Sequence, residues 1–222
     1  MMRYRTLMAV HESDGEHKSE IVDMTNPVEQ SVGGIQGHLL RRTIHLSMIW
    51  IPYLFFEFGE RIASSINFER DELIAFFLIA IIAGEFIRLK LGFTVFGQRA
   101  YEAHQVSALA WGGISICLVL LIVPHEEYAY PLIISLSLGD PFMGELRRKK
   151  VSHNMLVALT LVLLALIWMG AWHFFDTPWW FVPIMAPLCM VSEWPRYSII
   201  DDNATMLLIP LAGVVTLLPF VN

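Results

Sequence analysis

Long apolar stretches separated by short polar segments make up the chain from about residue 38 to its end. A helix needs about 20 predominantly apolar residues to cross a bilayer, with a range of roughly 17–25. The pattern therefore predicts an all-α, multi-pass bundle of about seven transmembrane helices, near residues 38–58, 72–90, 104–123, 129–143, 153–175, 178–194 and 204–221. The fourth stretch is short and bounded by Pro131 and Pro141, so we expect it to be broken or re-entrant.

The composition favours an integral membrane protein over a soluble globule. Hydrophobic residues make up 55% of the chain and charged residues 16%, whereas about a quarter of a soluble domain is charged. Residues 1–36 are polar, and we expect a disordered or surface-lying cytoplasmic tail ahead of a membrane domain over 37–222. The apolar run at 7–10 is too short for a cleaved signal peptide. Because Cys117 and Cys189 lie in apolar runs, we expect buried thiols rather than a disulfide.

The basic residues predict the orientation of these helices. With seven spans, the strongly basic ends all fall on one side of the membrane, which the positive-inside rule makes the cytoplasm. The N-terminus is then inside and the C-terminus outside, with the Trp179 and Trp180 pair in the interfacial belt of the far side. The basic ends hold Arg41, Arg42, Arg88, Lys90, Arg99, Arg147, Arg148, Lys149, Lys150 and Arg196.

Acidic residues gather at the same ends as these cations. Asp201 and Asp202 stand just before the last apolar stretch, and Asp140 ends the fourth. An isolated carboxylate at a membrane boundary carries a large desolvation cost, so these acids must be solvated, paired or bound to a cation. Carboxylates are the protein ligands of Mg²⁺ bound with nucleotide phosphates, and the cations at 147–150 suit the phosphates themselves. We therefore expect a metal and phosphate site on the cytoplasmic face, with Glu193 close by.

Other polar residues at this face have a structural and a functional interpretation. Arg41 and His45, four residues apart, share a helix face and either anchor the helix or bind phosphate. Glu85 with Arg88, and Arg99 with Glu102, have the spacing of intrahelical ion pairs that brace the site. The remaining alternatives are a simple turn at 139–141, a lipid-headgroup anchor at 147–150 and an N-cap at Asn203.

In this order, the charged blocks resemble those of the polyprenol/dolichol kinase and phytol kinase family, which is related to the CTP:phosphatidate cytidylyltransferases. Arg41-Arg42-x-x-His45 resembles the family's Arg-Lys-x-x-His, and Leu136-x-Leu138-Gly139-Asp140 its Leu-x-Leu-Gly-Asp block. Asp201-Asp202-Asn203-x-Thr205, with Ile209-Pro210-Leu211 after it, is similar to the closing Asp-Asp-Asn-Leu-Thr-(Ile/Val)-Pro-Leu, with two extra residues before the proline. Glu85-x-x-Arg88 and Arg99-x-x-Glu102 resemble the central charged blocks.

The resemblance implies a membrane lipid kinase that transfers the γ-phosphoryl group of CTP to an isoprenoid alcohol such as dolichol, polyprenol, geranylgeraniol or phytol. Its partners would be that alcohol, the nucleotide and membrane lipids, with no nucleic acid. The implied Mg²⁺ ligands and catalytic residues are Asp140, Asp201 and Asp202. Phosphate binding would involve Arg41, Arg42, His45, Arg147, Arg148, Lys149, Lys150 and Asn203, with Glu85, Arg88, Arg99, Glu102, Gly139 and Glu193 in support.

The chain also departs from the family pattern. It has Gly144 and a basic run where the family continues with Gly-Arg-x-x-Gly, and no counterpart of the family's Lys-Ser-x-Glu-Gly-Ser block. We therefore expect residues 147–150 to take over phosphate binding. Two other functions stay open: a cytidylyltransferase that makes a CDP-lipid, and a non-catalytic or transport protein, since charges inside a membrane also line transport paths.

Overall fold

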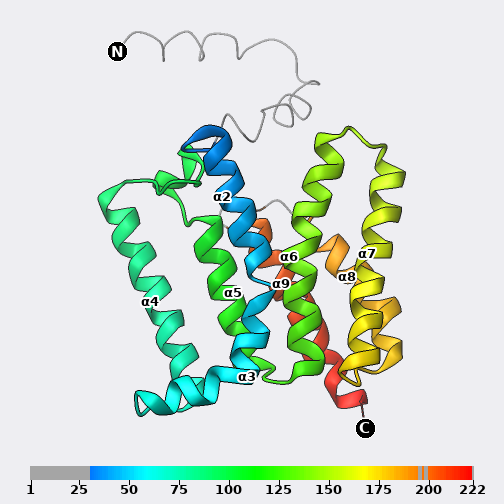
Figure 1. Ribbon diagram of the computed structural model, residues 1–222. Coiled ribbons are helices and arrows are strands. Elements are labelled where there is room, and N and C mark those ends of the chain that lie inside the picture. The colour runs from blue at the N-terminus through cyan, green and yellow to red at the C-terminus, as the bar shows by residue number, and fades with distance from the viewer. Residues whose placement is uncertain (1–30, 195–196, 198–199, 222) are drawn as a thin grey trace.

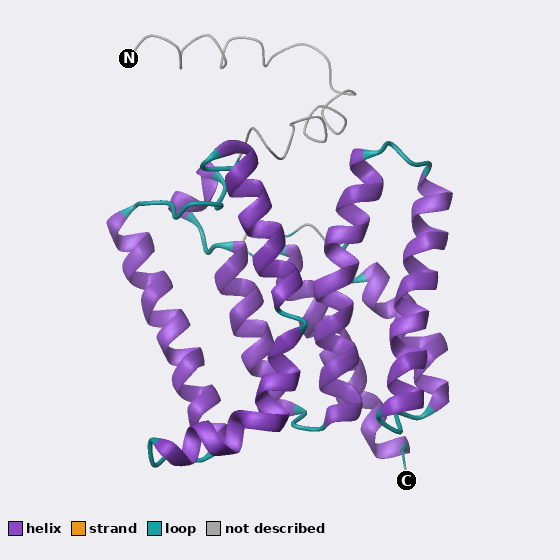
Figure 2. Cartoon of the chain, in the orientation of Figure 1, coloured by secondary structure: helices purple, strands orange, loops and turns teal. Residues whose placement is uncertain are grey.

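The computed structural model describes residues 31–194, 197 and 200–221, which are helical apart from loops and one isolated bridge between Ser31 and Arg99 (Figure 2). The expected all-α class is confirmed. Residues 1–30 of the tail expected at 1–36 lie outside the described residues, as does Arg196, and the first described helix begins at Gly34. The elements are α2 (Gly34–Ser47), α3 (Trp50–Ser65), α4 (Arg70–Leu91), η2 (Ala100–His104), α5 (Ala108–Ile122), α6 (Glu126–Arg148), α7 (His153–Phe174), η3 (Trp179–Phe181), α8 (Val182–Val191), α9 (Asp202–Leu217) and η4 (Leu218–Phe220).

The long helices stand side by side and run alternately between two edges of the bundle (Figure 1). We call the edge that holds the start of α2, the end of α4 and the α6–α7 connection the upper edge. The lower edge holds the α3–α4 and α5–α6 connections and the end of the described chain (Figure 1). The basic helix ends predicted to share a side therefore do so: Arg41, Arg88 and Arg147 all lie toward the upper edge.

Two of the described helical segments are long and apolar enough to cross a membrane, His153–Phe174 and Asp202–Phe220. Two further apolar helices, Ala108–Ile122 and Trp179–Val191, are shorter. Helix length and composition thus favour association with a membrane. These two candidate spans do not test the predicted arrangement of seven spans.

The central helix of the bundle is α6, which contacts α2, α3, α5, α7, α8 and α9. Apolar side chains along its length are fully buried, among them Leu132, Ile133 and Leu136. They join a core that includes Trp168 of α7 and Leu207 of α9. By contrast, α4 at one side of the bundle buries only Leu73 and Arg88 (Figure 1). The side chains on the inner face of α6 are therefore held in position by the helices packed around it.

The first expected span, at 38–58, is wrong as a single helix. The chain turns at Met48 and Ile49, between α2 and α3. Pro52 has no N–H, so it cannot donate to the carbonyl of Met48 four residues before it. The Ile51 N–H takes that carbonyl instead, at 3.0 Å. This tighter bond starts a new helix, which leads to α4 along the lower edge (Figure 1).

The fourth expected span differs in the opposite sense, because α6 is one continuous helix through Pro131 and Pro141. Pro131 leaves the carbonyl of Glu127 without its helical donor. The hydroxyl of Thr177, in the α7–η3 connection, donates to that carbonyl at 2.7 Å. Packing on all sides and this outside donor allow the helix to continue where the sequence alone suggests a break.

The sixth expected span, at 178–194, is also shorter than predicted. Regular helix in α8 ends at Val191 after ten residues, a rise of about 15 Å and half of a typical hydrocarbon core. In Figure 1 it accordingly ends at mid-height in the bundle. The residues after it, including Glu193, therefore lie inside the bundle rather than at its upper edge.

We predict that Thr177→Val lowers the free energy of unfolding by about 1 kcal/mol, since it removes a donor from a part-buried carbonyl without changing the side-chain shape. Thermal unfolding in detergent measures the change. In a Pro131→Ala background, which restores the helical N–H, the same substitution should have a smaller effect. Thr216→Val is the matched control, because the Thr216 hydroxyl bonds to a helical carbonyl that already has a backbone donor. Equal losses in both backgrounds would contradict this account.

Candidate functional site

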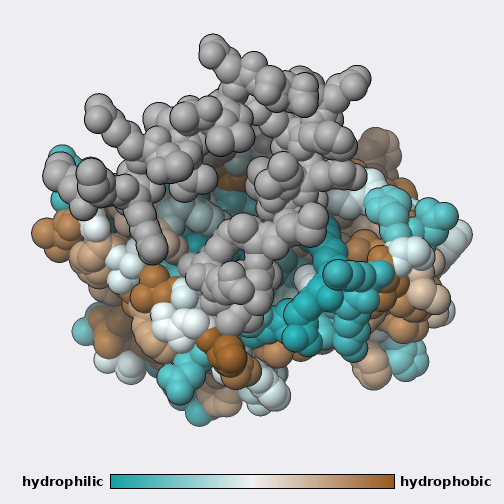
Figure 3. Space-filling view, turned by 90° about the horizontal axis from the view of Figure 1, so that it is seen from above, coloured by the Kyte–Doolittle hydropathy of each residue, from teal (hydrophilic) through white to brown (hydrophobic). Residues whose placement is uncertain are grey.

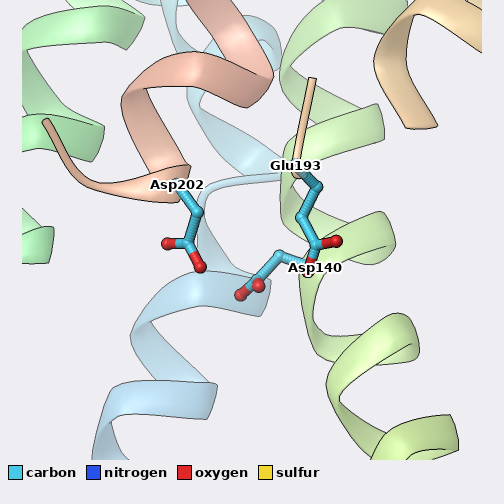
Figure 4. Close-up of side chains that lie close together, drawn as sticks. All are labelled: Asp140, Glu193 and Asp202. Atoms are coloured by element: carbon cyan, nitrogen blue, oxygen red, sulfur yellow. The ribbon is translucent and has the colours of Figure 1, made fainter. Parts of the chain in front are cut away.

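Three carboxylates from three separate segments meet in the upper half of the bundle. Oxygen atoms of Asp140, Glu193 and Asp202 lie within 4.8 Å of one another. Figure 4 shows the three side chains directed toward a common point. Asp140 comes from α6, Glu193 from the turn after α8, and Asp202 from the first residue of α9. Among the described residues, these three acids could hold a metal ion.

Gly139, beside Asp140, lies where α6 packs against α9 and α7. A Cβ at Gly139 would lie 3.4 Å from the Cε of Met206 on α9 and 3.5 Å from a methyl of Leu164 on α7, which is ordinary van der Waals contact. Gly139, predicted to support the site, therefore stands in the packed contact between the helices that carry Asp140 and Asp202.

The cluster is recessed below the upper edge. Asp140 stands eight residues before the last residue of α6, Arg148, which corresponds to about 12 Å along a helix. The short α8 and the late start of α9 place Glu193 and Asp202 at the same depth. Seen from above, the described residues show a hydrophilic patch, with hydrophobic residues along the outer sides (Figure 3).

Cations offset part of the negative charge of the cluster. Both terminal nitrogens of Arg147 pair with the two carboxylate oxygens of Glu193. Arg147 also lies within electrostatic reach of Asp140 and Asp202, and Arg99 within reach of Asp201 and Asp202. Sequence reasoning placed Glu193 among the supporting residues, whereas the structure places it inside the cluster.

Asp201 lies beside the cluster and caps α9. Its side chain accepts a hydrogen bond from the N–H of Asn203 at 3.1 Å. Burial, with the neighbouring charge of Asp202, raises the pKa of Asp201 to about 8, so that near neutral pH this group holds a proton. The structure therefore brings Glu193, in place of Asp201, next to Asp140 and Asp202.

His45 connects α2 to the cluster. Its Nε2 lies 3.6 Å from Oδ2 of Asp140 and 3.2 Å from the carbonyl oxygen of Leu136, and the ring is buried. Asn203 connects α9 to α5, because its amide nitrogen donates to the carbonyl of Ala108 at 3.1 Å. Both residues were predicted to bind phosphate, and both also join the helices that form the site.

Two buried ion pairs hold the α4–α5 connection against α2. The predicted pair of Glu85 and Arg88 forms, at 2.7 Å. Arg88 also donates to the carbonyls of Phe93, Glu102 and Gln105. The predicted pair of Arg99 and Glu102 is wrong, because the Glu102 carboxylate accepts from Arg41 of α2 at 2.8 Å. The three-residue spacing of Arg99 and Glu102 describes neighbours along one segment, so it could not indicate that Glu102 pairs with Arg41 of another helix.

The side chains of the basic run at 147–150 have different partners. Arg147 points to the cluster, whereas Arg148 pairs with Glu145 at 2.6 Å and Lys149 lies 3.8 Å from it. Arg42 pairs with the same Glu145 at 3.0 Å. Arg148, Lys149 and Lys150 are all exposed. Of the four predicted phosphate-binding cations in this run, Arg147 is the one that reaches the acids.

No family model, curated protein or solved structure matches the chain. The candidate site therefore depends on its own geometry and on the sequence motifs that led to it.

We predict that the purified protein binds Mn²⁺, measured by electron paramagnetic resonance, and that Mg²⁺ competes for the ion and raises the unfolding temperature, as a ligand of the folded state must. Asp140→Asn, Asp202→Asn and Glu193→Gln should each weaken binding about tenfold or more, because hard cations need charged oxygen ligands. Glu126→Gln, at the opposite end of α6, is the matched control. Unchanged affinity in all three variants would rule out this metal site.

We also predict that Arg88→Lys loosens the α4–α5 connection, since an ammonium cannot reproduce the fork of bonds that Arg88 makes. A loss of about 2 kcal/mol would speed amide hydrogen exchange over residues 93–107 roughly thirtyfold. Arg61→Lys, on the exposed face of α3, serves as the control. Exchange that stays as slow as in the wild type would show that Arg88 does not hold this segment.

Proposed function

We propose that the protein is a multi-pass membrane phosphotransferase that moves the γ-phosphoryl group of a nucleoside triphosphate, CTP by resemblance, onto an isoprenoid alcohol at the cytoplasmic face. The observation that carries the proposal is the convergence of Asp140, Glu193 and Asp202 within 4.8 Å. Arg147, Arg99 and Arg41 surround this cluster. Carboxylates for a metal and cations for phosphates are the two requirements of phosphoryl transfer.

Exposed apolar side chains support placement in a bilayer. On α4, Ile79 and Phe86 are 66% and 60% exposed, and on α7, Leu166 and Phe174 are 58% and 75% exposed. A soluble monomer seldom exposes apolar patches of this extent, whereas lipid covers them. The clustered acids and their cations lie in the upper half of the bundle, whereas a transport path needs polar groups through the full membrane depth.

The acidic cluster fits Mg²⁺ in the chemistry of its donors, since Mg²⁺ prefers carboxylate oxygen and substrate phosphates over nitrogen and sulfur. Asp140, Glu193 and Asp202 would hold it. When bound, the ion supplies positive charge that stabilises the negative charge on the transferred phosphoryl group.

The chain's own residues supply the rest of the chemistry. The alcohol oxygen attacks the γ-phosphorus, the bond from that phosphorus to the β-bridging oxygen breaks, and a nucleoside diphosphate leaves. Asp140, beside His45, is positioned to orient the hydroxyl and accept its proton. Arg147 and Arg99 lie where they can neutralise the phosphate oxygens.

We predict that purified protein with Mg²⁺ and γ-labelled CTP transfers label to polyprenol, geranylgeraniol or phytol. Asp140→Asn and Asp202→Asn should each lower the rate by about 10²–10³-fold, the loss typical of removing a preorganised electrostatic partner. Glu126→Gln should keep the wild-type rate. ATP and diacylglycerol complete the panel of donors and acceptors.

The products decide between reaction classes. Release of inorganic pyrophosphate with a CDP-lipid product would identify a cytidylyltransferase instead of a kinase. The absence of labelled lipid with every donor and acceptor would defeat the proposed function, and full activity in both aspartate variants would defeat the site assignment.

A further inference from the structure

A small pocket lies next to the acidic cluster, on its α2 side. Its volume is about 140 Å³. Leu40 and Ile44 of α2 and Met48 directly after it line one wall. The eight residue steps from Leu40 to Met48 correspond to about 12 Å along a helix. The opposite wall comes from the 95–98 segment and from Ala108 and Leu109 at the start of α5. The pocket is thus a mainly apolar slot that follows α2 into the bundle.

The polar groups of the pocket lie beside the cluster. His45 lines it and stands 3.6 Å from Asp140, while Asn203 lines it and directly follows Asp202. The Arg41 and Glu102 ion pair lies along the same wall as Leu40. A molecule in the slot would therefore meet the candidate metal ligands with its polar end.

The mouth of the slot is apolar and open to the outside of the bundle. Leu40, Val95, Phe96 and Leu109 are each 40–48% exposed. Such a mouth suits entry from the lipid side rather than from water, because each of these side chains would otherwise face solvent. The 95–98 segment is held in place by the residues just before α2: the N–H of Val32 donates to the carbonyl of Gln98, and the N–H of Gly97 to the carbonyl of Val32.

From these observations we infer that the slot binds the hydroxyl-bearing end of a single-chain lipid alcohol, which enters sideways between α2 and the start of α5. The inference rests on the proposed function and names where its acceptor lies. A cavity of about 150 Å³ holds one benzene-sized group, so the slot holds about the first five-carbon segment of a chain. The remainder leaves through the apolar mouth.

A nucleobase is the other planar, mixed-polarity group of similar size, and the contacts disfavour it. The amide of Asn203 already donates to Ala108, and the Glu102 carboxylate already accepts from Arg41 and the Arg99 N–H. Gln98 uses its amide oxygen to accept from the N–H of Val95. These polar groups are largely satisfied within the protein, so the surface offered to a ligand is mostly apolar.

Photolabelling tests the slot without requiring catalysis. The probe is a long-chain prenyl alcohol with a diazirine next to the hydroxyl-bearing carbon, applied to the full chain in detergent. Labelled residues should fall within 40–48 and 95–109. Leu109→Trp narrows the exposed mouth and should lower labelling about tenfold, since overfilling an apolar pocket opposes binding. Ile44→Trp, which fills the slot from α2, should act in the same direction. Ile79→Trp, on the outer face of α4, is the matched control and should label as the wild type does.

The outcomes separate this inference from the proposed function. Asp202→Asn should keep its labelling while losing transfer, because the slot binds the chain without the metal ligands. Slot labelling without any transfer activity would defeat the proposed function and leave the lipid slot standing. Transfer activity with labelling that Leu109→Trp and Ile44→Trp do not change would overturn the slot. Protection by CTP alone, with none by excess unlabelled alcohol, would also overturn it and assign the slot to the nucleotide.

Discussion

The arrangement of this protein depends on holding three carboxylates within 4.8 Å of one another inside a mainly apolar bundle. Like charges this close repel, and burial adds a desolvation cost to each of them. Direct pairing of Arg147 with Glu193 and the approach of His45 to Asp140 offset part of that repulsion. The remaining negative charge favours binding of a cation at the cluster. The surrounding helices can be understood as the framework that keeps the three acids together.

Three backbone features bring the acids to one point. Continuous helix in α6 carries Asp140 two turns below the upper edge. Early termination of α8 brings Glu193 down to the same depth, where Asp202 begins α9. Partial burial strengthens the electrostatic interactions among these side chains. The same recess brings the apolar slot beside α2 within reach of the acids.

The cations have different tasks, which the sequence does not separate. Arg88 and Arg41 are engaged by Glu85, Glu102 and backbone carbonyls, so they hold the α4–α5 connection in place. Arg42 and Arg148 share Glu145 away from the acids. Arg147 pairs with Glu193 of the cluster, and Arg99 lies within electrostatic reach of Asp202. Under the proposed function, the first group would position the acceptor slot and the last would meet the phosphates.

The sequence by itself determined the helical class, the common side of the basic helix ends and the positions of Asp140 and Asp202, because hydropathy and charge patterns are local. It could not determine that α2 and α3 separate at Met48, that α6 continues through both prolines, or that Glu193 joins the cluster. Those outcomes depend on partners distant in the chain: the Thr177 hydroxyl that replaces a lost helical donor, the Arg41 side chain that takes Glu102 from Arg99, and the packing of Met206 on Gly139. Tertiary contacts decided them, since a buried polar group takes whichever partner the fold brings nearest.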